Sequence, residues 1–225
     1  MSERTAEQTE HAGPPSERTR VRRLPERGAY DRETIDAILD EALICHLAWV
    51  QEGEPRVIPT IHARSGDTLY VHGSNASRTL RGTKGGEPVA VEVTLIDGLV
   101  LARSAFHHSM NYRSVVVYGR AREVTDPDEK FAAQRALVDH VAHGRANDAR
   151  MPNQRELDQT TLLAIPIEEA SAKIRTGPPK DDEEDMDLPI WAGVLPIRTV
   201  PGQPEPDPDL SGGVPAPGYV TDYQR

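Results

Sequence analysis

Three short segments rich in strand-forming residues, joined by tight turns, constrain the fold of this 225-residue chain more than any other feature. The segments are 45–50, 56–64 and 68–73, and residues that break regular structure separate them at 51–55 and 65–67. Consecutive strands joined by such short turns pair antiparallel. The sequence therefore predicts an antiparallel meander in this region.

Three further segments of the chain are predicted to be strands. The clearest is 110–125, which is continuously apolar at its centre and then alternates. Residues 161–177 predict a last strand with a bend. Residues 88–104 form either one bent strand or a hairpin around Asp97 and Gly98.

Helices are predicted around these strands. Residues 31–44 have apolar side chains at helical spacing after Asp31, a suitable N-cap. Residues 74–84 predict a short helix capped by Ser74 or Asn75. A helical turn is expected at 156–160. A longer helix is expected at 127–143, with five apolar residues on one face: Phe131, Ala132, Leu137, Val138 and Val141.

The order of these elements lacks the regular alternation of strand and helix that builds a doubly wound parallel sheet. Strands predominate, and helices lie between groups of strands. A closed antiparallel barrel with peripheral helices removes exposed sheet edges and suits this length. The predicted fold class is therefore mainly β.

The chain divides into three regions of different composition. Residues 1–22 are polar and predict a disordered leader, and residues 23–177 hold the barrel. Residues 178–225 form an acidic, proline-rich extension, in which six of the seven residues from Asp181 to Asp187 are acidic. The apolar segment 188–197, with Trp191, needs a surface to bury it, on its own barrel or on a second subunit.

Composition excludes several classes of protein. The net charge of −10 argues against nucleic-acid binding, which needs a basic surface. The single cysteine, Cys45, excludes an intrachain disulfide and a cysteine-rich zinc site, and its apolar surroundings predict a buried thiol. There is no secretory signal and no apolar stretch long enough to cross a membrane. A cytoplasmic protein is expected.

Five histidines lie in or beside predicted strands: His46, His62, His72, His107 and His108. No spacing places two of them on one face with a carboxylate, so no metal site is predicted. A haem iron needs only one histidine, so a haem ligand among them stays open. The sequence has no nucleophile elbow, and the acidic run 181–187 is interpreted as a solvated connector.

One group of polar residues, at 72–84, predicts a phosphate site. It follows a strand and opens a helix, whose first N–H groups are free to donate. Hydroxyls and cations accompany them: Ser74, Ser77, Arg78, Arg81 and Lys84. The alternative interpretation is a solvated basic helix face.

A second group, at 106–114, leads into the apolar strand. Its side chains offer mixed donors and acceptors, which the edge of a flat heterocycle needs: Ser109, Asn111, Tyr112, Arg113 and Ser114. The alternative is ordinary capping at the entrance of a strand.

Three segments together carry a resemblance to a known family: VIPTIHAR (57–64), LYVHGSNASRTLR (69–81) and SMNYRSVVVYGRAREV (109–124). With the order of elements, they resemble the pyridoxamine 5′-phosphate oxidase-like, FMN-binding split-barrel superfamily. Within it the chain is most similar to the nitroimidazole-resistance (Nim-type) and flavin-nucleotide-binding branch. The similarity covers residues 28–175.

This resemblance implies a homodimer of six-stranded antiparallel split barrels, with FMN at the subunit interface. It places Pro59 and Thr60 beside the flavin ring and Ser77, Arg78 and Arg81 on the phosphate. The other implied flavin contacts are His72, Gly73, Ser74, Asn111, Tyr112, Arg113 and Ser114. His72 is the implied catalytic residue, and Trp191 is predicted to cover the cleft of the partner subunit.

The implied function is that of an FMN-dependent oxidoreductase acting on a small molecule, with nitro reduction as one example. Vitamin B6 oxidation is not expected, because the C-terminal Arg/His set of true pyridoxamine phosphate oxidases is missing. One alternative is a non-catalytic protein that binds or senses flavin. Another is a split barrel that uses haem or a deazaflavin.

Overall fold

The computed structural model describes residues 13–75 and 77–224 and is mainly β. Within these residues it has nine strands: β1 (Gly28–Ala29), β2 (Ile44–Gln51), β3 (Glu54–Ser65), β4 (Thr68–Ser74), β5 (Gly85–Leu101), β6 (Ser109–Glu123), β7 (Thr160–Pro166), β8 (Glu169–Arg175) and β9 (Gly193–Pro196). The α-helices are α1 (Arg32–Glu41), α2 (Arg78–Thr83), α3 (Pro127–Val141), α4 (Arg145–Asp148), α5 (Gln154–Asp158) and α6 (Gly218–Thr221). Three single turns of 3-10 helix are η1 (Pro25–Arg27), η2 (Ala105–His107) and η3 (Glu183–Asp185).

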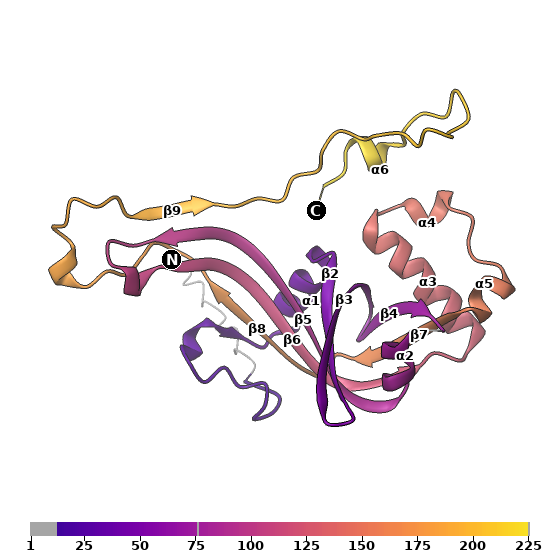
Figure 1. Cartoon of the computed structure of the whole chain (residues 1–225), viewed down its shortest axis with the longest axis horizontal. Coiled ribbons are helices and arrows are strands. Elements are labelled where there is room, and N and C mark those ends of the chain that lie inside the picture. Colours follow the sequence, from indigo (N-terminus) through magenta and orange to yellow (C-terminus); the bar gives the residue numbers. More distant parts are fainter. Residues whose placement is uncertain (1–12, 76, 225) are drawn as a thin grey trace, which may run out of the picture.

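Six of the strands close into a barrel, which confirms the predicted fold class. Their order is β6-β7-β4-β3-β2-β5, and a further pairing of β5 with β6 completes the ring. β5 and β6 are longer than the other barrel strands, so their hairpin end, residues 95–114, projects from the barrel as an arm (Figure 1). β8 pairs with β6, and β9 pairs with β5 on this arm.

The meander predicted at 45–73 is confirmed by the pairing of β2 with β3 and of β3 with β4. Glu52 and Gly53 both have positive φ, 54° and 80°, in the two-residue turn between β2 and β3. Such a turn matches the right-handed twist of the strands that it joins. It therefore fixes the register of β2 on β3.

The alternation of β2 divides its side chains between the barrel interior and the outer face. Cys45, Leu47 and Trp49 point inward and are buried against apolar residues of β5 and β6. Burial raises the pKa of the Cys45 thiol to about 12, which confirms the prediction of a buried, protonated cysteine. Residues 44, 46, 48 and 50 consequently face outward.

α1 closes one side of the barrel. The side chain of Asp31 accepts a hydrogen bond from the Thr34 N–H at 2.8 Å, as predicted for the N-cap, and three apolar side chains of the helix are buried. At the other end of α1, Glu41 accepts from Arg113 of β6 at 2.8 Å (Oε1 to Nη2). Arg113 also donates to Asp97 of β5 at 2.8 and 3.0 Å, so it ties α1 to the arm.

Two predicted boundaries are corrected, and one open alternative is decided. Ser77 caps α2 instead of Ser74 or Asn75, because Ser74 still pairs with Thr160 as the last residue of β4. Of the two alternatives for residues 88–104, the single bent strand is confirmed: β5 is one strand with an irregularity between Ile96 and Gly98. Residues 161–177 form two strands, β7 and β8, because the chain turns between Pro166 and Glu169.

The predicted apolar face of α3 is only partly correct. Leu137 is buried as predicted, but so is Ala133, whereas Phe131 and Val141 are each 40% exposed. The rotation of the helix is fixed at its first turn, where the Glu129 carboxylate accepts from the Tyr70 hydroxyl at 2.9 Å and pairs with Arg122. With the helix held in this rotation, fewer of its apolar side chains face the barrel than the sequence pattern predicted.

The two ends of the chain contact the barrel and its arm. Residues 1–12 of the predicted leader lie outside the described residues. Residues 13–22 are irregular but make specific contacts: Thr19 is buried, Arg18 pairs with Glu169, and the Val21 N–H donates to the Tyr30 hydroxyl at 2.8 Å. This part of the leader is therefore fastened to the barrel.

The C-terminal extension follows the arm and then leaves it. The predicted apolar segment 188–197 forms β9, but Trp191 stays 68% exposed. Residues 198–216, which we call the strap, are exposed throughout. After the strap the Tyr219 hydroxyl accepts from Arg145 at 3.0 Å, and the Tyr223 hydroxyl donates to the Val141 carbonyl at 3.0 Å.

None of the helices in the described part of the chain has the length and apolar character needed to cross a membrane.

The Arg113 contacts predict a measurable stability effect. Arg113→Met removes a cation shared by Glu41 and Asp97 and leaves the two carboxylates unpaired. Because the site is only partly buried, we expect the free energy of unfolding to fall by about 1–2 kcal/mol in urea titrations. Arg120→Met is the matched control, since among the described residues the Arg120 guanidinium donates to the Gly86 carbonyl and pairs with no carboxylate. Equal losses for both variants would contradict this account.

Candidate functional site

The structure brings together residues from two segments that the sequence singled out. β3 and β4 pair with His62 opposite Val71. Continuing this antiparallel register places Thr60 beside Gly73, so Pro59 and Thr60 lie next to the end of β4 that carries His72. α2 follows directly, so the predicted ring-side and phosphate-side residues share one edge of the barrel.

His72 is the most distinctive residue at this edge. Its ring is largely buried, and its Nδ1 atom is buried without a hydrogen-bond partner in the described part of the chain. Burial lowers the pKa of His72, so the imidazole is neutral at neutral pH. A buried ring nitrogen without a partner is costly and suits a site that a ligand completes.

The Leu80 side chain of α2 packs against Gly73 of β4. A Cβ atom at Gly73 would lie 2.8 Å from the Leu80 Cδ1 atom, so a larger residue there would require Leu80 to shift. The Ser77 Oγ accepts from the Leu80 N–H at 3.5 Å and starts the helix. Arg78 and Arg81 belong to α2, but their side chains lie outside the described part of the structure.

The predicted cation Lys84 has another role. It ends α2, and its Nζ pairs with the Glu123 carboxylate of β6 at 3.1 Å. Nearby, Gly82 lies over β2: a Cβ atom there would be 3.5 Å from Trp49 Nε1, which is also buried without a partner among the described residues. The edge formed by β2, β4 and α2 thus holds two unpaired ring nitrogens.

The second predicted group, residues 109–114, lies elsewhere in the same chain. These residues pair with β5 and β8 on the arm, which points away from α2 (Figure 1). Ser114 Oγ donates to the Lys173 carbonyl at 3.3 Å, and the Asn111 side chain accepts from Arg175. Within a single subunit, residues 109–114 therefore lie apart from His72.

Arg113, one of the flavin contacts implied by the resemblance, is not free to stabilise an anionic flavin. Its guanidinium lies against the carboxylates of Glu41 and Asp97, and the hydrogen bonds to these two groups raise the pKa of Arg113. Its charge is consequently already balanced within the chain.

Sequence reasoning missed Arg175. It is only 6% exposed, and in the described chain no carboxylate pairs with it. Its Nη atoms donate to the carbonyls of Gly177 and Pro178 at 3.2 Å each, and burial lowers its pKa. Arg175 thus fastens the start of the extension to the arm, and nothing in the sequence near it marks this role.

Most of the histidines hold structural positions. His62 is fully buried, with Nε2 2.9 Å from the Leu39 carbonyl, and its ring lies 4.7 Å from that of His140. His107 Nε2 lies 3.0 Å from Asp182, and His108 Nδ1 lies 2.9 Å from the Ser104 carbonyl. The described residues contain no cluster of three side chains suited to a metal ion.

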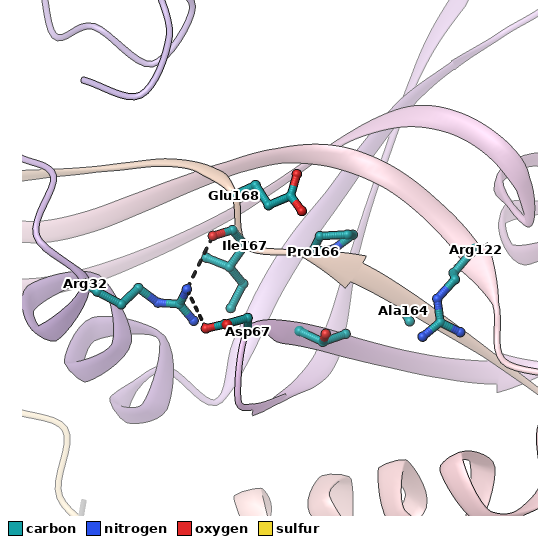
Figure 2. Close-up of a pocket in the computed structure, with 8 residues that line it drawn as sticks. Arg32, Asp67, Arg122, Ala164, Pro166, Ile167 and Glu168 are labelled. Carbon is teal, nitrogen blue, oxygen red and sulfur yellow. Dashed lines mark hydrogen bonds and ion pairs between the residues drawn. The ribbon is translucent and has the colours of Figure 1, made fainter. Parts of the chain in front are cut away.

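A hollow of about 400 Å³ opens at the other end of β4 and β7 and is lined by none of the predicted site residues (Figure 2). Arg32 and Arg122 both reach it. Arg32 pairs with Asp67 at 2.9 Å and donates to the Ile167 carbonyl at 3.4 Å, and Arg122 pairs with Glu129. The positive charge of each arginine is therefore balanced by a carboxylate. We consequently do not assign an anion site to this hollow.

Comparison with known proteins places these features in context. The family model described as pyridoxamine 5′-phosphate oxidase matches residues 31–174. No curated protein sequence matches the chain.

Solved structures give closer matches. The flavocytochrome Anf3 from Azotobacter vinelandii is 40% identical, with a TM-score of 0.89 over 95% of this chain and 99% of that one. The FAD and haem binding protein from Mycobacterium smegmatis is 37% identical, with a TM-score of 0.83 over 87% of this chain and 96% of that one. A candidate 5-nitroimidazole antibiotic resistance protein from Bacteroides thetaiotaomicron is 21% identical, with a TM-score of 0.56 over 65% of this chain and 86% of that one, and shares the fold.

The family match runs from the residue before α1 to the penultimate residue of β8. It therefore includes all six strands of the barrel. It agrees with the resemblance inferred from the sequence, and the chain belongs to the pyridoxamine 5′-phosphate oxidase family.

Proposed function

We propose that this protein is an oxidoreductase of the flavocytochrome type, which binds a flavin and a haem and passes electrons between them. The observation that carries the proposal is the 40% identity to a flavocytochrome over 95% of this chain. A second relative, described as binding FAD and haem, supports the same pair of cofactors. The sequence alone had left haem as an alternative to FMN.

We assign the flavin to the edge formed by β3, β4 and α2. The residues assigned from one subunit are Pro59, Thr60, His72, Gly73, Ser74, Ser77, Arg78 and Arg81. The fit rests on the buried Nδ1 of His72, which has no partner among the described residues, and on the packing of Leu80 from α2 against Gly73 of β4. A polar ring edge would complete the hydrogen bonding of His72, and the N–H groups and cations of α2 suit a phosphate.

The flavin that we propose is FAD rather than the FMN predicted from the sequence. Both carry a phosphate next to the ribityl chain, so the Ser77–Arg78 corner suits either. The relative described as binding FAD covers 87% of this chain, which favours the dinucleotide. Mass spectrometry of the flavin released from the protein separates the two.

When bound, the flavin supplies the hydride and electron chemistry. The protein contributes the environment. His72, neutral because of its burial, can donate or accept a proton at the flavin edge. We therefore keep His72 as the catalytic residue.

We also propose that the working form is a homodimer with the flavin between subunits. Tyr112 and Ser114 lie on the arm, away from the site of their own chain, and are assigned to the partner's flavin. Asn111 is left out, because it is only 8% exposed and its side chain accepts from Arg175. Arg113 is left out of this set, because two carboxylates hold it. Trp191, exposed beside the arm, is assigned to cover the partner's cleft.

The strap supports this assembly. It makes no hydrogen bond to the rest of the described chain, yet it is anchored by β9 at one end and by Tyr219 and Tyr223 at the other. Val200 and Val214 in the strap are 74% and 57% exposed. Proline-rich segments are extended and lose little entropy on docking, which suits a strap that lies across a second copy.

Absorption spectra of the purified protein test the proposed function. We expect flavin bands near ~370 and ~450 nm together with a Soret band. Addition of a reductant should bleach the flavin and shift the haem bands in one preparation. A flavin spectrum that stays free of haem after incubation with haemin would favour the non-catalytic flavin binder or the FMN oxidoreductase instead.

His72→Ala should leave the flavin bound but slow re-oxidation of the reduced flavin by about 10²-fold, because it removes the proton carrier at the ring edge. Stopped-flow absorbance at the flavin band measures this rate. His143→Ala is the control, since the His143 side chain is 99% exposed. Loss of the flavin from His72→Ala would mean that this residue holds the cofactor and does not take part in proton transfer.

Truncation after Ile197 should convert the dimer to a monomer or weaken it by at least tenfold, because the strap and its tyrosine anchors are lost. Light scattering over a concentration series measures the mass, and fluorescence titration measures flavin affinity. The double variant Tyr219→Ala/Tyr223→Ala, which keeps the strap but frees its end, should show a smaller loss. An unchanged mass and an unchanged flavin affinity in the truncated protein would contradict the assigned role.

A further inference from the structure

His46 lies next to a residue that we assign to the flavin ring. The alternation of β2 points its side chain out of the barrel, where it is 52% exposed. The register pairs it with Pro59 of β3 on the same face of the sheet. Because side chains directly opposite each other on antiparallel strands have Cβ atoms about 5 Å apart, a ring that lies against Pro59 is within reach of His46.

Glu92 of β5 holds the His46 ring from the other side. His46 Nδ1 lies 3.2 Å from Glu92 Oε2, and the other oxygen of Glu92 accepts a hydrogen bond from the Thr94 hydroxyl. A carboxylate only accepts hydrogen bonds, so the hydrogen between the two groups belongs to Nδ1. The neutral imidazole therefore keeps its lone pair on Nε2 and can take up a proton there, with Glu92 stabilising the imidazolium that forms.

The strands around His46 present no other ionisable side chain to it. Apart from the Thr94 hydroxyl, its further neighbours on this face of β2, β3 and β5 are apolar: Ile44, Ala48, Val57, Pro59, Ile61 and Ala90. Apolar surroundings strengthen a hydrogen bond between polar groups once a ligand excludes water from them. The His46–Glu92 pair is therefore the acid–base pair that this face offers to a ring lying on it.

Two other histidines in the described part of the chain pair with a carboxylate. His107 Nε2 lies 3.0 Å from Asp182 on the arm, and His143 Nδ1 lies 3.0 Å from Asp139 just beyond the end of α3. Neither is a neighbour of the residues assigned to the flavin. The position beside Pro59, and not the pairing alone, therefore distinguishes His46.

The redox cycle of the proposed flavin needs more than one proton acceptor. A neutral, fully reduced flavin that becomes oxidised loses two electrons and two protons, and the protons leave two different ring nitrogens. Two equivalents of a one-electron acceptor, ferric haem in the proposed function, take the electrons. His72, which stands on β4 across β3 from His46, takes one of the protons.

We propose that His46 Nε2 accepts the second proton when the flavin is re-oxidised and then returns it to water. This inference rests on the flavin assignment of the proposed function. One N–H bond of the flavin breaks and one N–H bond forms at Nε2, while no electron passes through the imidazole. His46 is thus a second catalytic residue. Glu92 is a positioning residue, because it fixes the tautomer that leaves Nε2 free to accept.

Stopped-flow absorbance at the flavin band tests the proposed role without haem. Full-length proteins loaded with FAD are photoreduced and mixed with ferricyanide, which takes one electron per molecule. His46→Ala should re-oxidise at least tenfold more slowly than the wild type, and free imidazole should restore the rate in His46→Gly. His143→Ala, which loses another histidine paired with a carboxylate, should match the wild type. The affinity for FAD, measured by fluorescence titration, should be the same in all of these proteins.

The solvent isotope effect separates proton transfer from a structural role. Glu92→Gln keeps a side chain of the same shape but removes the charge that stabilises the imidazolium, so re-oxidation should slow about threefold. In Glu92→Gln and His46→Ala the ratio of the rates in H2O and D2O should rise, because proton transfer then limits the reaction. An unchanged ratio in both variants would contradict the proposal.

Nuclear magnetic resonance of the full-length chain labelled with 15N-histidine gives a readout that does not depend on turnover. Without flavin, His46 should carry its hydrogen on Nδ1, and Glu92→Ala should remove this preference. Addition of FAD should shift the signals of His46 and leave those of His143 in place.

The outcomes distinguish this inference from the proposed function. Protein that binds no FAD would overturn both. Protein that binds FAD but no haem would overturn the flavocytochrome proposal alone, because ferricyanide replaces haem in the test. FAD-bound protein in which His46→Ala re-oxidises at the wild-type rate, or in which FAD leaves the His46 signals unmoved, would overturn the inference alone. Loss of FAD affinity in His46→Ala would also overturn it, since His46 would then hold the cofactor and not its proton.

Discussion

The pairing of β5 with β6 is the contact on which the rest of this structure depends. It closes the six-stranded ring, so the barrel has no unpaired edge there, and it continues beyond the ring to build the arm. The arm in turn gives β8 and β9 their partners and provides Asp97 and Arg113, which lock α1 in place. The β5–β6 hairpin therefore closes the barrel around its core and also provides the strand on which the C-terminal extension pairs.

The alternation of side chains along the strands separates apolar core residues from polar residues on the outer face. On β2, apolar side chains fill the barrel, while His46 faces outward beside Pro59 and Glu92. On β4, the same alternation and a close helix leave His72 half-enclosed next to α2. The two histidines stand on β2 and β4, with β3 between them.

Local patterns predicted much of the fold because they act over a few residues. The turn at Gly53, the Asp31 cap and the apolar β6 strand depend on neighbours in sequence, and all three were correct. The rotation of α3 was not predictable, since Glu129 is fixed by Tyr70 from a distant strand. For the site, Pro59 and Thr60 lie next to the end of β4 that carries His72 and Gly73. Arg113, in contrast, is held by two carboxylates from other elements, and Arg175 carried no local signal.

Cys45 and His46 are adjacent in sequence but separated by the thickness of the sheet. The only thiol in the chain is sealed inside the barrel, and its pKa of about 12 keeps it protonated. Peroxide and superoxide attack thiolates first. Because this one sulfhydryl is protonated and hidden behind a β-sheet, it resists oxidants of the kind that reduced flavins release when oxygen is present.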